Sequence, residues 1–166
     1  DLEVLPNLAQ SWEWSDDRKA LTMHLIEGAK WSDGEPFTSE DVRFYWEDTV
    51  LEPRIPSFSS QNALGEGAKL EIVDEYTIRW YFEKASQNQA LYNMAFMTFC
   101  PGPAHILKPL HPKYNDNVTF EDFSNALPAS EVPTVTMGPW VPVSYKDDQI
   151  IVLRRNPYYW KVDEAG

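Results

Sequence analysis

Two histidines have side chains of the type that binds metal ions in proteins. His105 and His111 are six residues apart, with Pro109 between them. This spacing differs from the four-residue interval that places two metal ligands on one face of a helix. The chain also has a single cysteine, which excludes a metal site built from several cysteines. A metal-dependent hydrolase that uses His105, His111 and nearby carboxylates is therefore the weaker alternative, and we expect no metal ion and no cofactor.

The other nucleophilic and acidic side chains lie in settings that favour a structural role. Cys100 follows the apolar run Met97-Thr98-Phe99, and a thiol in apolar surroundings is expected to be buried and unreactive. Three acidic pairs lie at the tips of predicted hairpins, where aspartate favours turns. These pairs are Asp16-Asp17, Asp74-Glu75 and Asp147-Asp148. No nucleophile has a general base at a workable spacing, so we expect a protein that is not an enzyme.

The charge of the chain argues against a nucleic-acid partner. The 166 residues include 26 acidic and 14 basic side chains, so the formal net charge is −12 at pH 7. A surface that binds phosphates needs clustered lysine and arginine, which this composition does not supply. The sequence also has no run of roughly 18 apolar residues, the length that a membrane-spanning helix requires. The length fits one domain with its own core, and we expect residues 1–166 to form a single domain.

The stretch from Trp31 to Val42 combines a turn with the start of a helix. Asp33-Gly34 is a turn sequence, because glycine adopts positive φ angles without strain. Thr38 and Asp41 have the spacing of a capping box, in which each side chain accepts a hydrogen bond from the backbone at the other position. Apolar residues then repeat at helical spacing on one predicted buried face, and Pro53 ends the helix. The residues of this face are Val42, Tyr45, Trp46, Thr49 and Val50.

Three pairs of segments have the alternating apolar pattern that is typical of β-hairpins. The pairs are 11–15 with 20–27, 69–73 with 76–84, and 140–145 with 149–155. One strand of the second pair has four large apolar residues on one face, and burying each of them stabilises the fold by about 1.5–3 kcal/mol. The four predicted core residues are Tyr76, Ile78, Trp80 and Phe82. His24 lies on the more polar face of the first hairpin, and we expect no functional role for it.

Two further helices are predicted between the hairpins. Residues 88–99 have apolar side chains at helical spacing, and Pro101-Gly102-Pro103 ends that helix. The proline-rich region 108–136 is expected to be irregular, apart from a short helix at 120–126. Antiparallel hairpins with inserted helices indicate an α+β fold rather than a doubly wound one.

Several motifs, taken in order, resemble those of the family-5 extracellular solute-binding proteins. They are LAQSW at 8–12, KWSDGEPFTSEDV at 30–42, GPW at 138–140 and LRRNPYYW at 153–160. The resemblance spans nearly the whole chain. Members of this family are the large receptors of ABC importers for peptides, nickel and oligosaccharides, and they close two lobes around a ligand.

The resemblance implies that residues 1–166 are a fragment of the first lobe of a type II, cluster C periplasmic-binding-protein fold. It implies a receptor that captures a peptide or another small polar solute in the periplasm or outside the cell, with or without a lipid anchor. The receptor would deliver this ligand to ABC permease subunits. An oligosaccharide is the alternative ligand, since sugar rings stack on tryptophan and tyrosine. We expect the fragment itself to be monomeric.

The resemblance also implies a ligand surface formed by the loop after the capped helix and by the segment before residues 103–106. The candidate ligand-binding residues are Arg54, Ile55, Phe58, Phe96, Met97, Phe99 and Trp140. Arg54 has a planar guanidinium that can pair with a carboxylate or stack on a sugar, although a solvated loop arginine also fits. For Trp140, packing in the core is the favoured interpretation and contact with the ligand cleft is the other. The motif residues Asp33, Gly34, Pro36, Thr38 and Asp41 are expected to form the turn and the cap rather than to contact ligand.

Overall fold

The chain divides into two compact units in the computed structural model, which describes residues 3–55, 64, 67–86, 88–95, 99–125 and 132–161. Unit 1 contains Asp1–Glu27 and Thr38–Ala104, and unit 2 contains Gly28–Phe37 and His105–Gly166. Each unit is therefore assembled from two separate stretches of the sequence. That residues 1–166 form one domain of a first lobe stays a prediction.

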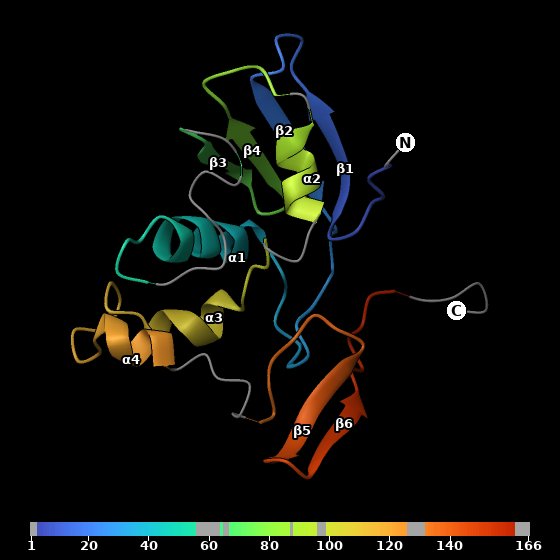
Figure 1. Ribbon diagram of the computed structural model, residues 1–166. Helices are drawn as coiled ribbons and strands as arrows, with labels where there is room; N and C mark the ends of the chain where they lie inside the picture. Colours follow the sequence, from blue (N-terminus) through green and yellow to red (C-terminus); the bar gives the residue numbers. More distant parts are fainter. Residues whose placement is uncertain are drawn as a thin grey trace. The chain divides into compact units, whose positions relative to one another are not determined.

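Unit 1 is built on a four-stranded antiparallel sheet (Figure 1). The strands are β1 (Ala9–Trp14), β2 (Ala20–Leu25), β3 (Lys69–Asp74) and β4 (Thr77–Tyr81). β1 pairs with β2 and β3 pairs with β4, so the first two predicted hairpins are confirmed. The strand order is β1-β2-β4-β3, because β2 also pairs with β4. This pairing makes one sheet from two hairpins.

The two central strands carry much of the core of unit 1. Their buried residues are Leu21, Met23 and Leu25 on β2 and Ile78 and Trp80 on β4, with Phe82 just beyond β4. Leu21 lies opposite Trp80, and Trp80 is 0% exposed. Tyr76, which the pattern places in the core, is only half-buried because it lies in the turn between β3 and β4.

A capped helix follows the turn at residues 31–34. α1 (Ser39–Arg43) continues directly into the π-helix η1 (Phe44–Val50). Oγ1 of Thr38 accepts a hydrogen bond from the amide of Glu40 over 3.3 Å, and Oδ2 of Asp41 accepts one from the amide of Thr38 over 2.9 Å. The capping box and the helix are thus confirmed. The wider register of η1 was not predicted, and in it the amide of Leu51 donates to the carbonyl of Trp46, five residues back.

This helix is buried on two sides, so the prediction of one buried face is wrong. Trp46 and Val50 are buried as the helical spacing requires. Phe44 and Asp48 are buried as well, although each is about half a helical turn away from Trp46. A helix enclosed on two sides buries residues outside any single amphipathic stripe.

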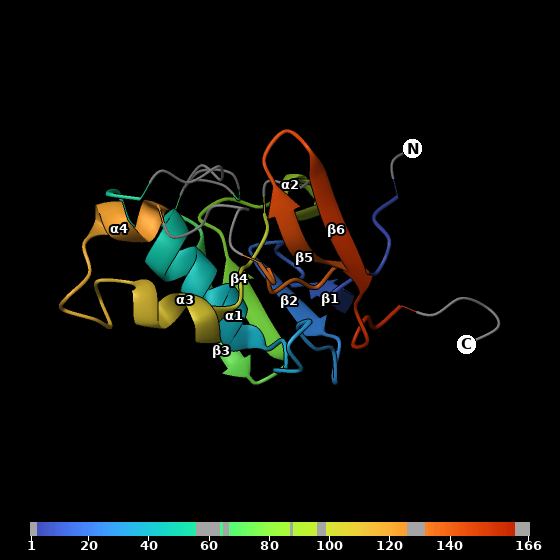
Figure 2. The same cartoon turned by 90° about the horizontal axis from the view of Figure 1, so that it is seen from below.

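α2 (Gln89–Ala95) covers one face of the sheet in unit 1. It lies in front of the strands in Figure 1 and above them in Figure 2. Ala90 and Leu91 are its buried residues. The helix predicted at 88–99 is confirmed as far as Ala95; residues 96–98 lie outside the described residues, and Phe99 is not helical. Among the described helices, none has the length and the apolar composition of a membrane-spanning segment.

Unit 2 contains short helices and a two-stranded hairpin. α3 (Ala104–Leu107), which begins at the last residue of unit 1, continues into the 3-10 helix η2 (Lys108–Leu110). α4 (Phe120–Asn125), β5 (Trp140–Lys146) and β6 (Ile150–Arg155) follow. The short helix and the third hairpin are confirmed, but α3 and η2 were not predicted. The prolines at 101 and 103 were interpreted as the end of a helix. Proline is also common at the start of a helix, and α3 begins directly after Pro103.

Candidate functional site

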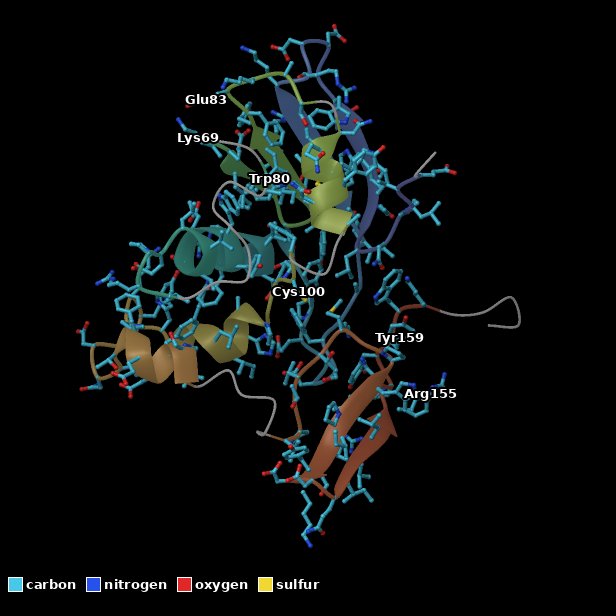
Figure 3. All side chains as sticks on the ribbon, in the orientation of Figure 1. Lys69, Trp80, Glu83, Cys100, Arg155 and Tyr159 are labelled. Carbon is cyan, nitrogen blue, oxygen red and sulfur yellow. The ribbon has the colours of Figure 1, made fainter. Side chains whose placement is uncertain are left out.

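An aromatic cluster in unit 1 includes Phe99, a candidate residue of the predicted ligand-binding segment before residues 103–106. We use this name for Tyr45, Trp46, Trp80 and Phe99. The ring of Phe99 lies 5.1 Å from that of Tyr45 and 5.9 Å from that of Trp80, measured between centroids. Trp46 and Trp80 lie 5.0 Å apart with their planes 89° from parallel, the edge-to-face geometry that aromatic pairs favour. Figure 3 labels Trp80 on β4. Phe99 therefore packs against the core, and its contact with a ligand stays a prediction.

A buried carboxylate fixes the other end of the same segment. Asp41 is 4% exposed, and its Oδ1 accepts a hydrogen bond from the amide of Ala104 over 2.8 Å. Its Oδ2 accepts the capping hydrogen bond from Thr38. Hydrogen bonds to an ionised acceptor are stronger than those between neutral groups. Residues 99–104 are thus attached to the capped helix by Phe99 at one end and by Asp41 at the other. The bond to Ala104 spans 63 positions, so no local pattern in the sequence reveals it.

Arg54 is paired within its own loop. Its Nε and Nη2 donate to the two carboxylate oxygens of Glu52 over 2.6 and 2.9 Å, and the arginine side chain is 64% exposed. The hydrogen bond to Glu52 raises the pKa of the guanidinium above its ordinary value. The neighbouring Ile55 is 6% exposed, so its side chain is buried in the protein. Phe58 lies outside the described residues. Ligand contact by Arg54, Ile55 and Phe58 stays a prediction.

Trp140 is 56% exposed at the start of β5, so its interpretation as a core residue is wrong. The reason is that successive residues of a strand point to opposite faces, and the next residue, Val141, occupies the buried face of β5 at 2% exposure. An exposed indole is compatible with the other interpretation, a ligand-binding residue, which stays a prediction. The remaining candidates Phe96 and Met97 lie outside the described residues.

Cys100 is exposed, so the prediction of a buried thiol is wrong. The preceding Phe99 points into the aromatic cluster. The apolar run before it therefore describes the surroundings of Phe99 and not those of the thiol.

The two histidines have separate roles in unit 2. Nε2 of His105 lies 2.7 Å from Oδ2 of Asp33, an ion pair between α3 and the turn when the histidine is protonated. His111 is 2% exposed, its ring lies 4.8 Å from that of Phe123, and its Nδ1 accepts a hydrogen bond from the amide of Lys113. No group of three or more His, Cys, Asp or Glu side chains that could hold a metal ion occurs among the described residues. The structure therefore offers no support for the metal-dependent alternative.

The motif residues at the two ends of the sequence meet in unit 2. The amide of Ser32 donates to the carbonyl of Thr136, and the amide of Thr136 donates to Oγ of Ser32, both over 3.0 Å. Asn156 is 2% exposed, and its Nδ2 donates to the carbonyl of Gly138 over 2.9 Å. These contacts join the turn at 31–34 to Thr136, just before GPW, and join GPW to NPYYW. Motif residues from 32, 138 and 156 thus contribute hydrogen bonds within unit 2.

These motifs and this fold define a class of binding protein. Residues 3–165 match the family described as bacterial extracellular solute-binding proteins, family 5 Middle. The chain belongs to this family. The α+β fold of antiparallel hairpins with inserted helices, predicted from the sequence, is confirmed by structural neighbours among periplasmic binding proteins.

Among the relatives, the periplasmic alpha-galactoside-binding protein of Rhizobium meliloti strain 1021 is 56% identical over 100% of this chain and 24% of its own length. The solved structure of the periplasmic binding protein MelB from Agrobacterium fabrum C58, in complex with stachyose, has a TM-score of 0.93 and 57% identity over 100% of this chain and 25% of its own. The oligopeptide-binding protein OppA has a TM-score of 0.84 and 32% identity, over 97% of this chain and 27% of its own. The chain thus spans about a quarter of the length of these relatives.

Proposed function

We propose that the chain is part of the substrate-binding component of an ABC importer, and that the whole protein captures an α-galactoside oligosaccharide. The observation that carries this proposal is the likeness to the MelB complex with stachyose, at 57% identity over the whole chain. The Rhizobium meliloti relative, at 56% identity, is named for α-galactoside binding. More than half of the aligned residues are identical in each of these two comparisons.

The exposed side chains of two candidate residues suit a sugar. Trp140 is 56% exposed and offers the flat apolar face on which a sugar ring stacks. Arg54 is exposed and carries a planar group that can bind hydroxyls or stack on a ring. Behind residues 99–104, the aromatic cluster and Asp41 provide the rigid support that a pre-formed binding surface needs.

A peptide is the second candidate ligand. The likeness to OppA, with a TM-score of 0.84, favours it, but the identity of 32% is lower than that to the α-galactoside-binding relatives. Arg54 could pair with a peptide carboxylate as well as with a sugar. We therefore place the oligosaccharide first and the peptide second.

We further infer that the protein performs no reaction. Membership of a family of binding proteins supports this, and so do the structural roles of the two histidines. We place the whole protein in the periplasm or outside the cell, with or without a lipid anchor, where ABC permease subunits would receive its ligand. The periplasmic relative supports this location.

The test is calorimetry with a chain of the relatives' full length that contains these 166 residues. We expect stachyose to bind with a Kd of about 1 µM or tighter and trialanine to give no binding heat. Trp140→Ala should weaken stachyose binding by about tenfold or more, whereas Tyr114→Ala, which removes another exposed aromatic ring, should leave the Kd unchanged. Binding of trialanine but not stachyose would replace the sugar by the peptide. Binding of neither would overturn the proposal.

A further inference from the structure

The turn at residues 31–34 contains a dipeptide that is prone to spontaneous chemical change. Asp33-Gly34 is the one Asp-Gly pair in the 166 residues, and the sequence has no Asn-Gly pair. In an Asp-Gly pair the amide nitrogen of the glycine can attack the carboxyl carbon of the aspartate, because glycine has no side chain to hinder the approach. The product is isoaspartate, and its formation needs no enzyme.

The reaction has two steps and conserves the atoms of the chain. First, a bond forms from the nitrogen of Gly34 to Cγ of Asp33, and the amide proton leaves with the hydroxyl of the protonated carboxyl group as water. Water then opens the resulting five-membered imide. Cleavage of the new bond restores aspartate, whereas cleavage of the original peptide bond leaves isoaspartate, in which the main chain runs through Cγ. The turn is then longer by one main-chain carbon.

The fold holds the carboxyl group of Asp33 at both oxygens. Nε2 of His105 lies 2.7 Å from Oδ2, and the amide of Glu35 donates to Oδ1 over 3.3 Å. An ionised carboxylate only accepts hydrogen bonds, so Nε2 of the histidine is the donor of the shorter one. Ring closure must bring Cγ to bonding distance of the Gly34 nitrogen, which moves both oxygens away from their donors. The two hydrogen bonds therefore oppose the attack.

The attacking nitrogen is restrained as well. The amide of Gly34 donates to the carbonyl of Trp31 over 2.9 Å, and the attack requires the loss of this amide proton. The side chain of Tyr158 lies so close that a Cβ atom added to Gly34 would be 3.2 Å from its Cζ. This packing limits the rotation of the peptide group that ring closure requires.

We propose that Asp33-Gly34 is a site of spontaneous isoaspartate formation, and that His105 restrains the reaction by holding the carboxyl group of Asp33. The side chains of His105 and Asp33 are 30% and 31% exposed, so water reaches the turn and can open the imide. His105 lies on α3, 72 positions further along the chain, so this restraint exists only in the folded protein. The turn is affected in the same way whichever ligand the protein binds.

The test follows isoaspartate formation over time in a chain of the relatives' full length at neutral pH. Trypsin cleaves after Lys30 and Arg43 and releases residues 31–43, in which electron-transfer mass spectrometry distinguishes isoaspartate from aspartate. We expect the folded chain to react about tenfold or more slowly than the urea-unfolded chain. In folded protein, His105→Ala should speed the reaction by about fivefold or more, because the donor to Oδ2 is lost.

Two control variants separate the hydrogen bond from a general loss of packing. His105→Gln keeps a side-chain N–H donor and should react more slowly than His105→Ala. His24→Ala removes another partly buried histidine, in unit 1, and should react at the parent's rate. All three variants should match the parent when unfolded in urea. Circular dichroism identifies a variant that fails to fold, and His105→Leu, which also lacks a donor, then takes the place of His105→Ala.

Three results would overturn the proposal. The first is an absence of isoaspartate even in the unfolded chain, since Asp33-Gly34 would then not be a modification site. The second is an equal rate for the parent and His105→Ala in folded protein, which would remove the restraint. The third is a slower rate in His105→Ala, because His105 would then promote the reaction by giving a proton to the leaving oxygen. Each of these results leaves the proposed binding function untouched.

Discussion

Gly34 lies against the phenol end of the Tyr158 side chain. A Cβ atom added to Gly34 would be 3.2 Å from Cζ and 3.3 Å from the phenol oxygen of this ring. The φ angle of Gly34 is +98°, a value that residues with side chains rarely adopt. Two motifs from opposite ends of the sequence therefore meet at a position that needs glycine for two reasons.

A comparison of two glycines separates these reasons. Gly28 also has a positive φ, +79°, but an added Cβ there would meet nothing within 4 Å. Gly28→Ala and Gly34→Ala should both lower the free energy of unfolding, because both strain the backbone. The loss in the free energy of unfolding should be larger for Gly34→Ala than for Gly28→Ala by about 1 kcal/mol or more, since the added methyl group at position 34 also crowds the Tyr158 ring. Urea unfolding of the two variants measures the difference. Equal losses would show that the Tyr158 ring moves aside freely.

The capping box predicts a modest stabilising role for Thr38. Thr38→Ala removes the hydroxyl that accepts from the amide of Glu40, and we expect the free energy of unfolding to fall by about 1 kcal/mol. Thr38→Ser keeps the hydroxyl and is the matched control, with an expected change within about 0.5 kcal/mol. Both are measured by chemical unfolding. An alanine variant as stable as the parent would show that the cap contributes nothing.

Hydrogen bonds from a second threonine, Thr119, lower the pKa of Asp122. The hydroxyl and the amide of Thr119 donate to Oδ2 of Asp122 over 2.6 and 2.9 Å. These hydrogen bonds, that of the hydroxyl first, hold the pKa of Asp122 below its ordinary value. Because the pKa is lowered in the folded state, the stabilisation is present above the unfolded pKa and is lost as pH falls through the folded one.

Thr119→Val removes the hydroxyl donor and should raise the pKa of Asp122 toward its ordinary value. The stabilisation from this carboxylate at neutral pH should shrink accordingly. NMR titration of the Asp122 side chain in the parent and the variant measures the pKa directly. An identical pKa in both proteins would contradict the role assigned to the Thr119 hydroxyl.

Local patterns in the sequence predicted the separate pieces of the fold. The Thr38–Asp41 capping box and all three hairpins depend on residues close together in the chain, where capping and alternation rules apply. The joining of the first two hairpins through β2 and β4 was not predictable, because alternation does not specify which strand lies beside which. The burial of η1 on two sides was not predictable either, because it is set by tertiary packing.

The contacts of the candidate site residues were harder to predict from the sequence than the elements of the fold. The pairs Phe99–Trp80 and Asp41–Ala104 both join distant positions. Neither contact leaves a local signal, and the apolar residues before Cys100 did not reveal that its thiol is exposed. The contact of His105 with Asp33 likewise appears only once the chain is folded.

The central claim is that these residues form part of a solute-binding surface, and amide hydrogen exchange in the full-length chain tests it most directly. Saturating stachyose should slow exchange by about fivefold or more in residues 50–55 or 99–104, the described stretches that hold the candidate residues Arg54 and Phe99. Exchange at the β1–β2 turn, residues 15–19, serves as the control and should not change. Stachyose binding that leaves every amide of residues 1–166 unaffected would contradict the account.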